Sequence, residues 1–338
     1  MPPPPGARPK CRRRAAGNRA RTFAVREFDL IDRIRARVGV RDDVVLGIGD
    51  DAALLQVPAG RLLVVATDTL NDGVHFPSDT APADIGWKAL AVNLSDLAAM
   101  GAEPAWCTLS LSLPHSDATW LEGFIDGFLA LAAQHGVVLV GGDTTRGPLS
   151  ISVTVHGFAT PGQALRRDAA RVGDEVWVSG TLGDAAGALL QWQQGAHRDP
   201  ALRERLDRPT PRVALGRALP GLASCAIDVS DGLVADLGHV CRASGVGIDL
   251  DLEALPASAA LLAAFDVDTL HRLQATGGDD YELCFTVSPA QADALRRVAA
   301  STGTVVTRIG RVVDGKGVRA FVGGDEWRPA TAGYVHFG

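Results

Sequence analysis

The alternation of apolar and polar positions is most regular between residues 61 and 159. Period-two alternation or a short apolar run predicts a strand in each of four segments, 61–68, 106–114, 137–143 and 149–159. Longer segments with helical periodicity lie between them, at 84–100 and 117–135. The predicted order is β-α-β-α-β-β, an α+β domain.

A second block of alternating strands and helices begins near residue 175. Strands are predicted at 175–180, 225–230, 246–252, 281–287 and 305–313, and helices at 181–195, 231–245 and 289–300. The stretch 160–174 has few large apolar side chains, and 196–212 is charged and loop-like. We therefore predict a two-domain protein, with an N-terminal domain over 26–160 and a C-terminal α/β domain over 161–338.

The predicted helix 84–100 contains a charged residue where none is expected. Apolar side chains lie on nearly every side of its helical wheel, which is typical of a buried helix. Asp96 lies within it, and a buried carboxylate needs a partner because an isolated charge is costly to remove from water. We expect Asp96 to face a cation.

The charge distribution separates the N-terminus from the rest of the chain. Residues 1–25 contain seven basic and no acidic side chains up to Arg21 and no apolar stretch, so we predict a disordered tail, with nucleic-acid contact as the weaker alternative. Without those seven charges the net charge of −6 becomes −13. An acidic body disfavours nucleic acid, and it disfavours phosphorylated ligands unless metal cations intervene.

Cysteine usage and hydropathy indicate a cytoplasmic protein without a membrane span. The five cysteines are far apart and form no CxxC pair, as in proteins of a reducing compartment. No apolar run approaches the ~18 residues that cross a bilayer.

Aspartates recur where predicted strands end. They occur in GIGDDAA (47–53), VVATDTL (64–70), GGDTTRG (141–147), AIDVSDGL (226–233) and ATGGDDYEL (275–283). One such Asp is ordinarily a turn former or a helix N-cap. Five together, at the strand ends where α/β domains bind ligands, indicate a shared site. Converging carboxylates repel one another, and oxygen ligands without a His or Cys cluster favour Mg²⁺ or Mn²⁺.

Phosphate is the expected companion of such a metal site. Glycines precede Asp50, Asp143 and Asp279, and glycine lets the backbone approach a phosphate closely. The chain has no Walker A loop and no protein-kinase motif set. A nucleotide is therefore expected to bind through metal ions, not through lysine.

Seven motifs taken together resemble the thiamine-monophosphate kinase family of the aminoimidazole-ribonucleotide-synthetase-like superfamily. They are EFDLI (27–31), GIGDDAALL (47–55), TDTLNDGVHF (67–76), KALAVNLSDLAAMGAEP (88–104), GGDTTRGPLS (141–150), IDVSDGL (227–233) and GGDDYEL (277–283). The similarity runs from about residue 27 to residue 337. It implies transfer of the ATP γ-phosphoryl group to thiamine monophosphate, with several Mg²⁺ ions, in a homodimer whose N-terminal sheets pair into a barrel.

The resemblance also assigns residues. The implied metal ligands are Asp51, Thr67, Asp68, Asp96, Asp143, Asp228 and Asp231. The implied ATP contacts are Gly142, Asp143, Arg167 and Ser230, and the implied thiamine monophosphate contacts are His75, Asp279 and Tyr334. No catalytic group beyond the metal ligands is implied. The family commonly has Glu where this chain has Asp279, and often Ser where it has Ala66.

Three of these residues also have ordinary structural explanations. Arg167 could serve as an interdomain salt-bridge partner, Tyr334 could pack the C-terminus, and His75 could be a surface histidine. Two other functions are considered: another ATP-using enzyme of the superfamily, such as a purine cyclo-ligase, and a non-catalytic nucleotide-binding dimer. Because a monophosphate acceptor is already anionic, we expect direct in-line attack without a dedicated base.

Overall fold

The computed structural model describes residues 27–195 and 198–334. The predicted basic tail, residues 1–25, lies outside the described residues. Within the described part, no helix combines the length and the hydropathy needed to cross a membrane.

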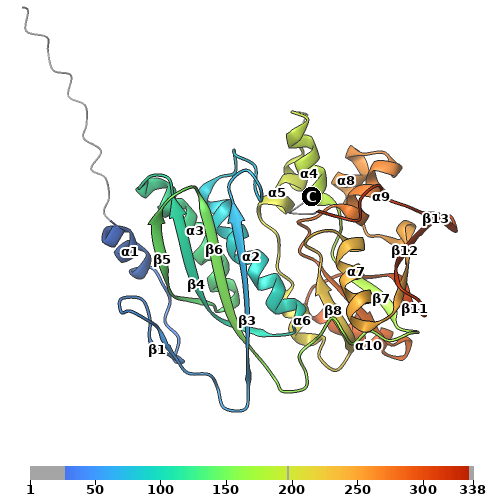
Figure 1. Cartoon of the computed structure of the whole chain (residues 1–338), viewed down its shortest axis with the longest axis horizontal. Helices are drawn as coiled ribbons and strands as arrows, with labels where there is room; N and C mark the ends of the chain where they lie inside the picture. Colours follow the sequence, from blue (N-terminus) through green and yellow to red (C-terminus); the bar gives the residue numbers. More distant parts are fainter. Residues whose placement is uncertain (1–26, 196–197, 335–338) are drawn as a thin grey trace, which may run out of the picture.

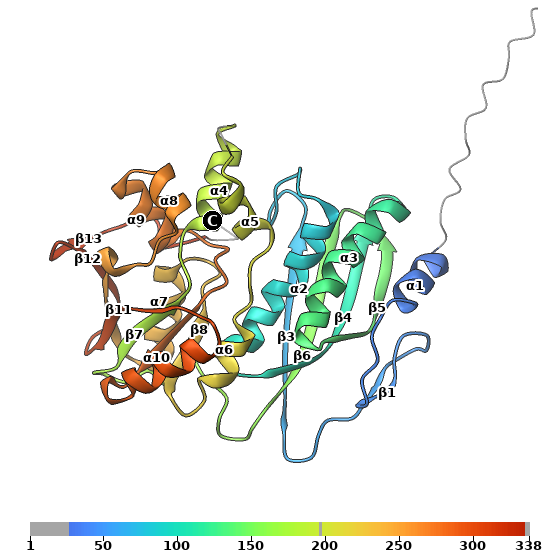
Figure 2. The same cartoon turned by 180° about the vertical axis from the view of Figure 1, so that it is seen from behind.

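The N-terminal domain is a four-stranded sheet with two long helices on one face (Figures 1 and 2). The strand order is β3 (Leu62–Asn71), β6 (Ser150–Ala159), β4 (Glu103–Leu113) and β5 (Val138–Arg146). β6 is antiparallel to both β3 and β4, whereas β4 and β5 are parallel. The helices are α2 (Pro82–Ala99) and α3 (Ala118–His135). The β-α-β-α-β-β order predicted for 61–159 is confirmed.

Glycines set the spacing between these two helices. A Cβ added at Gly86 would lie 1.9 Å from the carbonyl oxygen of Phe124, and one at Gly127 would lie 1.7 Å from that of Ala83. The two backbones therefore touch, and no larger side chain fits at either crossing point.

The second face of this sheet is only partly covered. The short hairpin of β1 (Val44–Leu46) and β2 (Leu54–Leu55) packs over one end of it, where Trp106 and Phe158 are buried. Helix α1 (Glu27–Arg35) lies beside β5 (Figure 1). Toward the other end, Ser and Thr side chains alternate along the open face, as in the hydrogen-bonded pairs Thr69–Ser152 and Thr67–Thr154.

The C-terminal domain is built on a seven-stranded mixed sheet. Its order is β13 (Asp325–Trp327), β12 (Gly317–Val322), β9 (Gly247–Asp251), β11 (Val306–Val313), β7 (Glu175–Ser179), β10 (Leu283–Val287) and β8 (Ala223–Asp228). All neighbours are antiparallel except β12 and β9. Its helices are α4 (Asp184–Gln193), α5 (Pro200–Asp207), α6 (Val213–Ala218), α7 (Leu233–Ser244), α8 (Ala259–Ala264), α9 (Val267–Thr276) and α10 (Ala292–Ser301), with 3-10 turns at Leu252–Ala254 and Pro289–Gln291. The five strands and three helices predicted for this domain are all present.

The prediction that 196–212 is loop-like was wrong, because the segment contains α5. Asp199 caps this helix by accepting hydrogen bonds from the Ala201 and Leu202 amides, and Pro200 occupies its first turn. Leu202 and Leu206 are buried. The five arginines of the segment all form ion pairs with carboxylates: Arg198, Arg203, Arg205, Arg208 and Arg212.

Helix α2 is shared by the two domains. One side packs on α3 and the N-terminal sheet, and the other packs on α6 and β8. Thirteen of its 18 residues are buried. One continuous apolar cluster joins Leu97 of α2 to Trp177 and Phe285 of the C-terminal sheet. The helix is apolar on all sides because both domains pack against it.

Candidate active site

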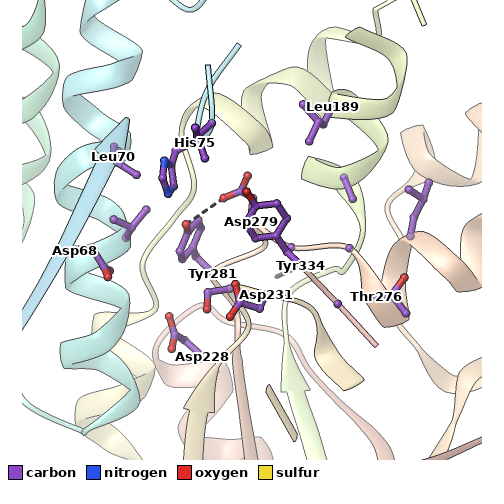
Figure 3. A pocket seen from close by; sticks show the side chains of 18 of the residues that line it. Asp68, Leu70, His75, Leu189, Asp228, Asp231, Thr276, Asp279, Tyr281 and Tyr334 are labelled. Carbon is purple, nitrogen blue, oxygen red and sulfur yellow. Dashed lines mark hydrogen bonds between the residues drawn. The ribbon is translucent and has the colours of Figure 1, made fainter. Parts of the chain in front are cut away.

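A cleft with a volume of about 810 Å³ lies between the two domains. Its walls are the end of β3, helix α2, the loop after β8, helices α4 and α9, and the segment that contains Tyr334 (Figure 3). It lies at the carboxyl ends of β3 and β8, which is where the predicted aspartates cluster.

Asp96 faces other carboxylates. Asp96 lines the cleft from α2, and Asp68 of β3 and Asp228 of β8 lie close enough to change its pKa. Burial, together with those two acids, raises the pKa of Asp96 to about 8, and Arg167 opposes this rise. The pKa of Asp228 is also raised, mainly by burial. The pKa of Asp68 is raised by burial and by Asp231, and lowered by His75. The negative charges of this cluster therefore outnumber the positive charge that Arg167 brings to it.

Two polar residues of α2 that the sequence analysis did not assign hold this cluster in place. Ser95 donates a hydrogen bond to Asp228 Oδ2 at 2.8 Å, across the domain boundary. Asn93 Oδ1 accepts from the Asp68 amide at 2.9 Å. Like Asp96, they are polar residues in an otherwise apolar helix, so the same anomaly could have identified them.

A third unassigned residue, Asp236, shapes the loop after β8. Its Oδ2 accepts from the amides of Ser230, Asp231 and Gly232 at 3.0, 3.1 and 3.2 Å. Burial, with the nearby charges of Asp228 and Asp231, raises the pKa of Asp236 to about 7. Because one carboxylate oxygen binds three successive amides, it fixes the direction of the Ser230 and Asp231 side chains.

The predicted contacts of the acceptor, thiamine monophosphate, also come together in this cleft. His75, Asp279 and Tyr334 all line it, and Figure 3 shows His75 and Asp279 on facing walls. His75 Nδ1 accepts from the Asn71 amide at 3.0 Å, so the neutral ring carries its proton on Nε2. The Tyr334 amide donates to the Asp231 carbonyl at 2.9 Å, which links the C-terminal segment to the acidic loop.

Two of the four predicted ATP contacts, Arg167 and Ser230, also line this cleft. Arg167 is the basic residue whose charge lowers the pKa values of both Asp96 and Asp228. It therefore lies where an anion bound beside the carboxylates would meet a positive charge.

Four predicted residues are placed differently. Thr67 lines the cleft, but its hydroxyl donates to Val153 O and accepts from Thr154 Oγ1 on the open face of the sheet, opposite to Asp68, because successive strand residues point to opposite faces. Gly142 and Asp143 lie on β5, at the far edge of the sheet, where they line a small cavity of about 90 Å³ together with Ile48. Asp51, in the loop that follows Ile48, does not line the cleft. One chain therefore does not bring all seven predicted metal ligands together.

The donor set of the cleft suits a hard divalent cation. Among residues 27–195 and 198–334, no three His, Cys, Asp or Glu side chains are grouped closely enough to form a ready-made metal site. The oxygen-only set and the raised carboxylate pKa values still fit Mg²⁺, which retains water and binds protein through only one or two carboxylates.

Family models cover most of the chain. The model "AIR synthase related protein, N-terminal domain" matches residues 49–159, and "AIR synthase related protein, C-terminal domain" matches 171–323.

Individual relatives are also similar over nearly their whole length. Thiamine-monophosphate kinase of Salmonella typhimurium is 47% identical over 93% of this chain and 99% of its own. The crystal structure of thiamine-monophosphate kinase from Stenotrophomonas maltophilia is 58% identical, with a TM-score of 0.83 over 90% of this chain and 98% of its own. AaThiL complexed with AMPPCP and TMP is 35% identical, with a TM-score of 0.73 over 92% and 97%. From these matches, the chain belongs to the thiamine-monophosphate kinases, within the AIR synthase related family.

Proposed function

We propose that this protein transfers the γ-phosphoryl group of ATP to thiamine monophosphate, giving thiamine diphosphate, in the cleft between its two domains. One observation carries the proposal: the same cleft contains a cluster of mutually repelling carboxylates and a group of polar side chains. The carboxylates are Asp68, Asp96 and Asp228, and the polar group is His75, Asp279 and Tyr334. Family membership supplies the substrates, since a relative of 35% identity is complexed with AMPPCP and TMP.

Mg²⁺ is the expected cofactor, in several ions. Asp68, Asp96, Asp228 and Asp231 would hold it within this chain. When bound, Mg²⁺ neutralises the repulsion between these carboxylates and the phosphates and stabilises charge on the transferred group. Arg167 adds a fixed positive charge on the same wall, and Ser230 is aimed by the three amide contacts of Asp236.

The protein's own groups favour direct transfer. The acceptor phosphate is an anion and needs no base to remove a proton. His75 accepts the Asn71 amide on Nδ1, so in its neutral form it presents an N–H to the cleft and acts as a donor to the acceptor. Orientation is therefore the main task of His75, Asp279 and Tyr334.

A homodimer accounts for the residues outside the cleft. Among the described residues no strand pairs with the outer side of the edge strand β3, which exposes Leu63 and Val65, as expected of a strand that pairs with another copy. We propose that two N-terminal sheets close into a barrel. If the β5 edge of one sheet meets the β3 edge of the other, Asp51, Gly142 and Asp143 approach the partner's cleft.

The direct test is a product assay. The purified protein, supplied with ATP, Mg²⁺ and thiamine monophosphate, should form thiamine diphosphate, and free thiamine should be a very poor substrate. ATP labelled in the γ-phosphate should leave no label on the protein in the absence of acceptor. A labelled protein that passes its phosphate to thiamine monophosphate would overturn the direct mechanism, and absence of any thiamine diphosphate would overturn the function.

Mixing two inactive variants tests the shared site. Asp68→Asn and Asp143→Asn should each be inactive alone. If each site uses Asp68 of one subunit and Asp143 of the other, exchange of subunits should restore about a quarter of the wild-type rate, because half of the dimers then contain one intact site. No recovery after subunit exchange would place both residues in the same subunit's site or outside it.

We keep the division into domains 26–160 and 161–338 as part of this proposal, and we place the reaction in the cytoplasm. Cys107, Cys225, Cys241 and Cys284 are all free and buried, in keeping with a reducing compartment.

A further inference from the structure

Lys88 is a buried lysine in a chain that almost always uses arginine. The sequence has three lysines, Lys10, Lys88 and Lys316, among 33 basic residues. Lys88 is in α2 and its side chain is only 1% exposed. A buried ammonium requires close partners, since its transfer from water is otherwise strongly unfavourable.

The partners of Lys88 come from both walls of the cleft. Its Nζ donates to the carbonyl oxygen of His75 at 3.0 Å and lies 3.3 Å from Asp279 Oδ2. His75 belongs to the N-terminal domain and Asp279 to the C-terminal domain. One enclosed ammonium therefore joins the two facing residues that we assign to the acceptor.

A second acid lies within the range of the Lys88 charge, but another residue already binds it. Burial raises the pKa of Asp207 and the charge of Lys88 opposes this rise, yet Arg203 Nε is 2.5 Å from Asp207 Oδ2. Asp279 is thus the carboxylate that depends on Lys88.

Asp279 is held in an unusual backbone conformation. Its φ is 68° and that of Tyr281 is 50°, so two residues with side chains adopt left-handed values within three positions. Such conformations persist only where the surroundings enforce them, and they concentrate at binding sites. The Tyr281 hydroxyl donates to Asp279 Oδ1 at 3.1 Å, as Figure 3 shows, while Lys88 engages Oδ2. Both carboxylate oxygens therefore have a defined partner.

We propose that Lys88 is a positioning residue for the acceptor: by binding Asp279 and the His75 carbonyl at once, it fixes the two walls of the acceptor site at one separation and one orientation. This inference rests on the proposed function and adds to it a residue that does not itself touch substrate. A guanidinium would not serve equally, because the enclosed site fits a compact ammonium.

The test uses Lys88→Met, which keeps the length of the side chain and removes its charge. We expect the KM for thiamine monophosphate to rise at least tenfold, while kcat and the KM for ATP stay within about threefold. A purely structural role would lower the melting temperature without separating the two KM values. Lys316→Met is the matched control, because Lys316 is exposed in the turn between β11 and β12. It should leave all three constants unchanged.

A double variant keeps the test decisive if Lys88→Met alone folds poorly. Lys88→Met combined with Asp279→Asn removes both charges, so neither is left buried without its partner. If Lys88 acts through Asp279, the KM for thiamine monophosphate should increase less in the double variant than the product of the two single effects. Where only Asp279→Asn can be measured, the double variant should raise this KM no more than Asp279→Asn does.

Failure of the inference and failure of the proposed function give different results. An active wild-type enzyme whose KM for thiamine monophosphate is unchanged by Lys88→Met, or changes in parallel with that for ATP, refutes the positioning role alone. A wild-type protein that forms no thiamine diphosphate refutes the function and, with it, this inference.

Discussion

Replacing Asp96 by Asn should stabilise the metal-free protein, and the gain should depend on pH. Asp96 is enclosed with Asp68 and Asp228, and its pKa is raised from 3.8 to about 8. Between these two values the unfolded chain releases the proton of Asp96 while the folded protein keeps it, so stability falls as the pH rises. Asn has no proton to release and lacks this pH dependence.

The magnitude follows from the same pKa values. At about 1.36 kcal/mol per pH unit, the displacement from 3.8 to about 8 sets an upper limit of about 6 kcal/mol. The advantage of Asp96→Asn should be near zero at pH 4, grow through pH 5, 6 and 7, and level off near pH 8. We expect about 3 to 6 kcal/mol at pH 8, the lower part of the range allowing for partial exposure of Asp96 to water.

Urea unfolding in EDTA at pH 5, 6, 7 and 8 measures this difference directly. Asp314→Asn, in the exposed turn between β11 and β12, is the matched control and should change little at any pH. Mg²⁺ with a non-hydrolysable ATP analogue should then stabilise the wild type more than Asp96→Asn. A variant no more stable than the wild type at pH 8 in EDTA, or more stable by the same amount at every pH, would refute the idea of a repelling carboxylate cluster.

Three further predictions concern the acceptor site and the packing around it. His75→Ala should raise the KM for thiamine monophosphate about tenfold with a smaller effect on kcat; steady-state kinetics showing mainly a loss of kcat would instead indicate a base. Gly127→Ala should destabilise the protein by about 3 kcal/mol in urea unfolding, since its Cβ would lie 1.7 Å from a carbonyl oxygen. Gly238→Ala in α7, where the nearest atom would be 3.6 Å from the Cβ, should be neutral or stabilising. Equal effects of the two substitutions would contradict this account of the α2–α3 contact. Glu282→Gln should reduce the free energy of unfolding by about 3–5 kcal/mol, because Glu282 is fully buried and binds the guanidinium of Arg212 at 2.5 and 2.6 Å. A melting temperature unchanged from the wild type would show that the pair contributes nothing to stability.

The periodicity of the sequence was enough to locate the elements that carry the site. The strand predicted at 61–68 is β3, and the helix predicted at 84–100 is α2. Both are long and strongly patterned. Helix α5 was missed because its apolar face consists of two leucines in eight residues. Its arginines also pair with carboxylates in distant parts of the chain, Arg203 with Asp79 and Arg205 with Glu282. Local composition cannot show such partners.

The acidic cluster could be predicted, but its full membership could not. Asp68, Asp96 and Asp228 follow from strand ends and from one anomalous helix position. The edge position of Asp143 depends on the strand order β3-β6-β4-β5, which no short-range pattern specifies. Lys88 and Asp236 were missed for a similar reason: each acts through contacts with backbone or side chains that only the folded chain brings near.

The position of α2 in both cores has a consequence for motion. Two domains joined by a linker can rotate about it, and many kinases close on their substrates in this way. Here a hinge motion would have to separate α2 from one of the two sheets on which it packs, and would expose Leu97 or its neighbours to water. We therefore expect the walls of the cleft to keep their distance throughout the catalytic cycle, with substrates entering a preformed opening. The two domains should also unfold together, as one cooperative unit, when the protein is heated.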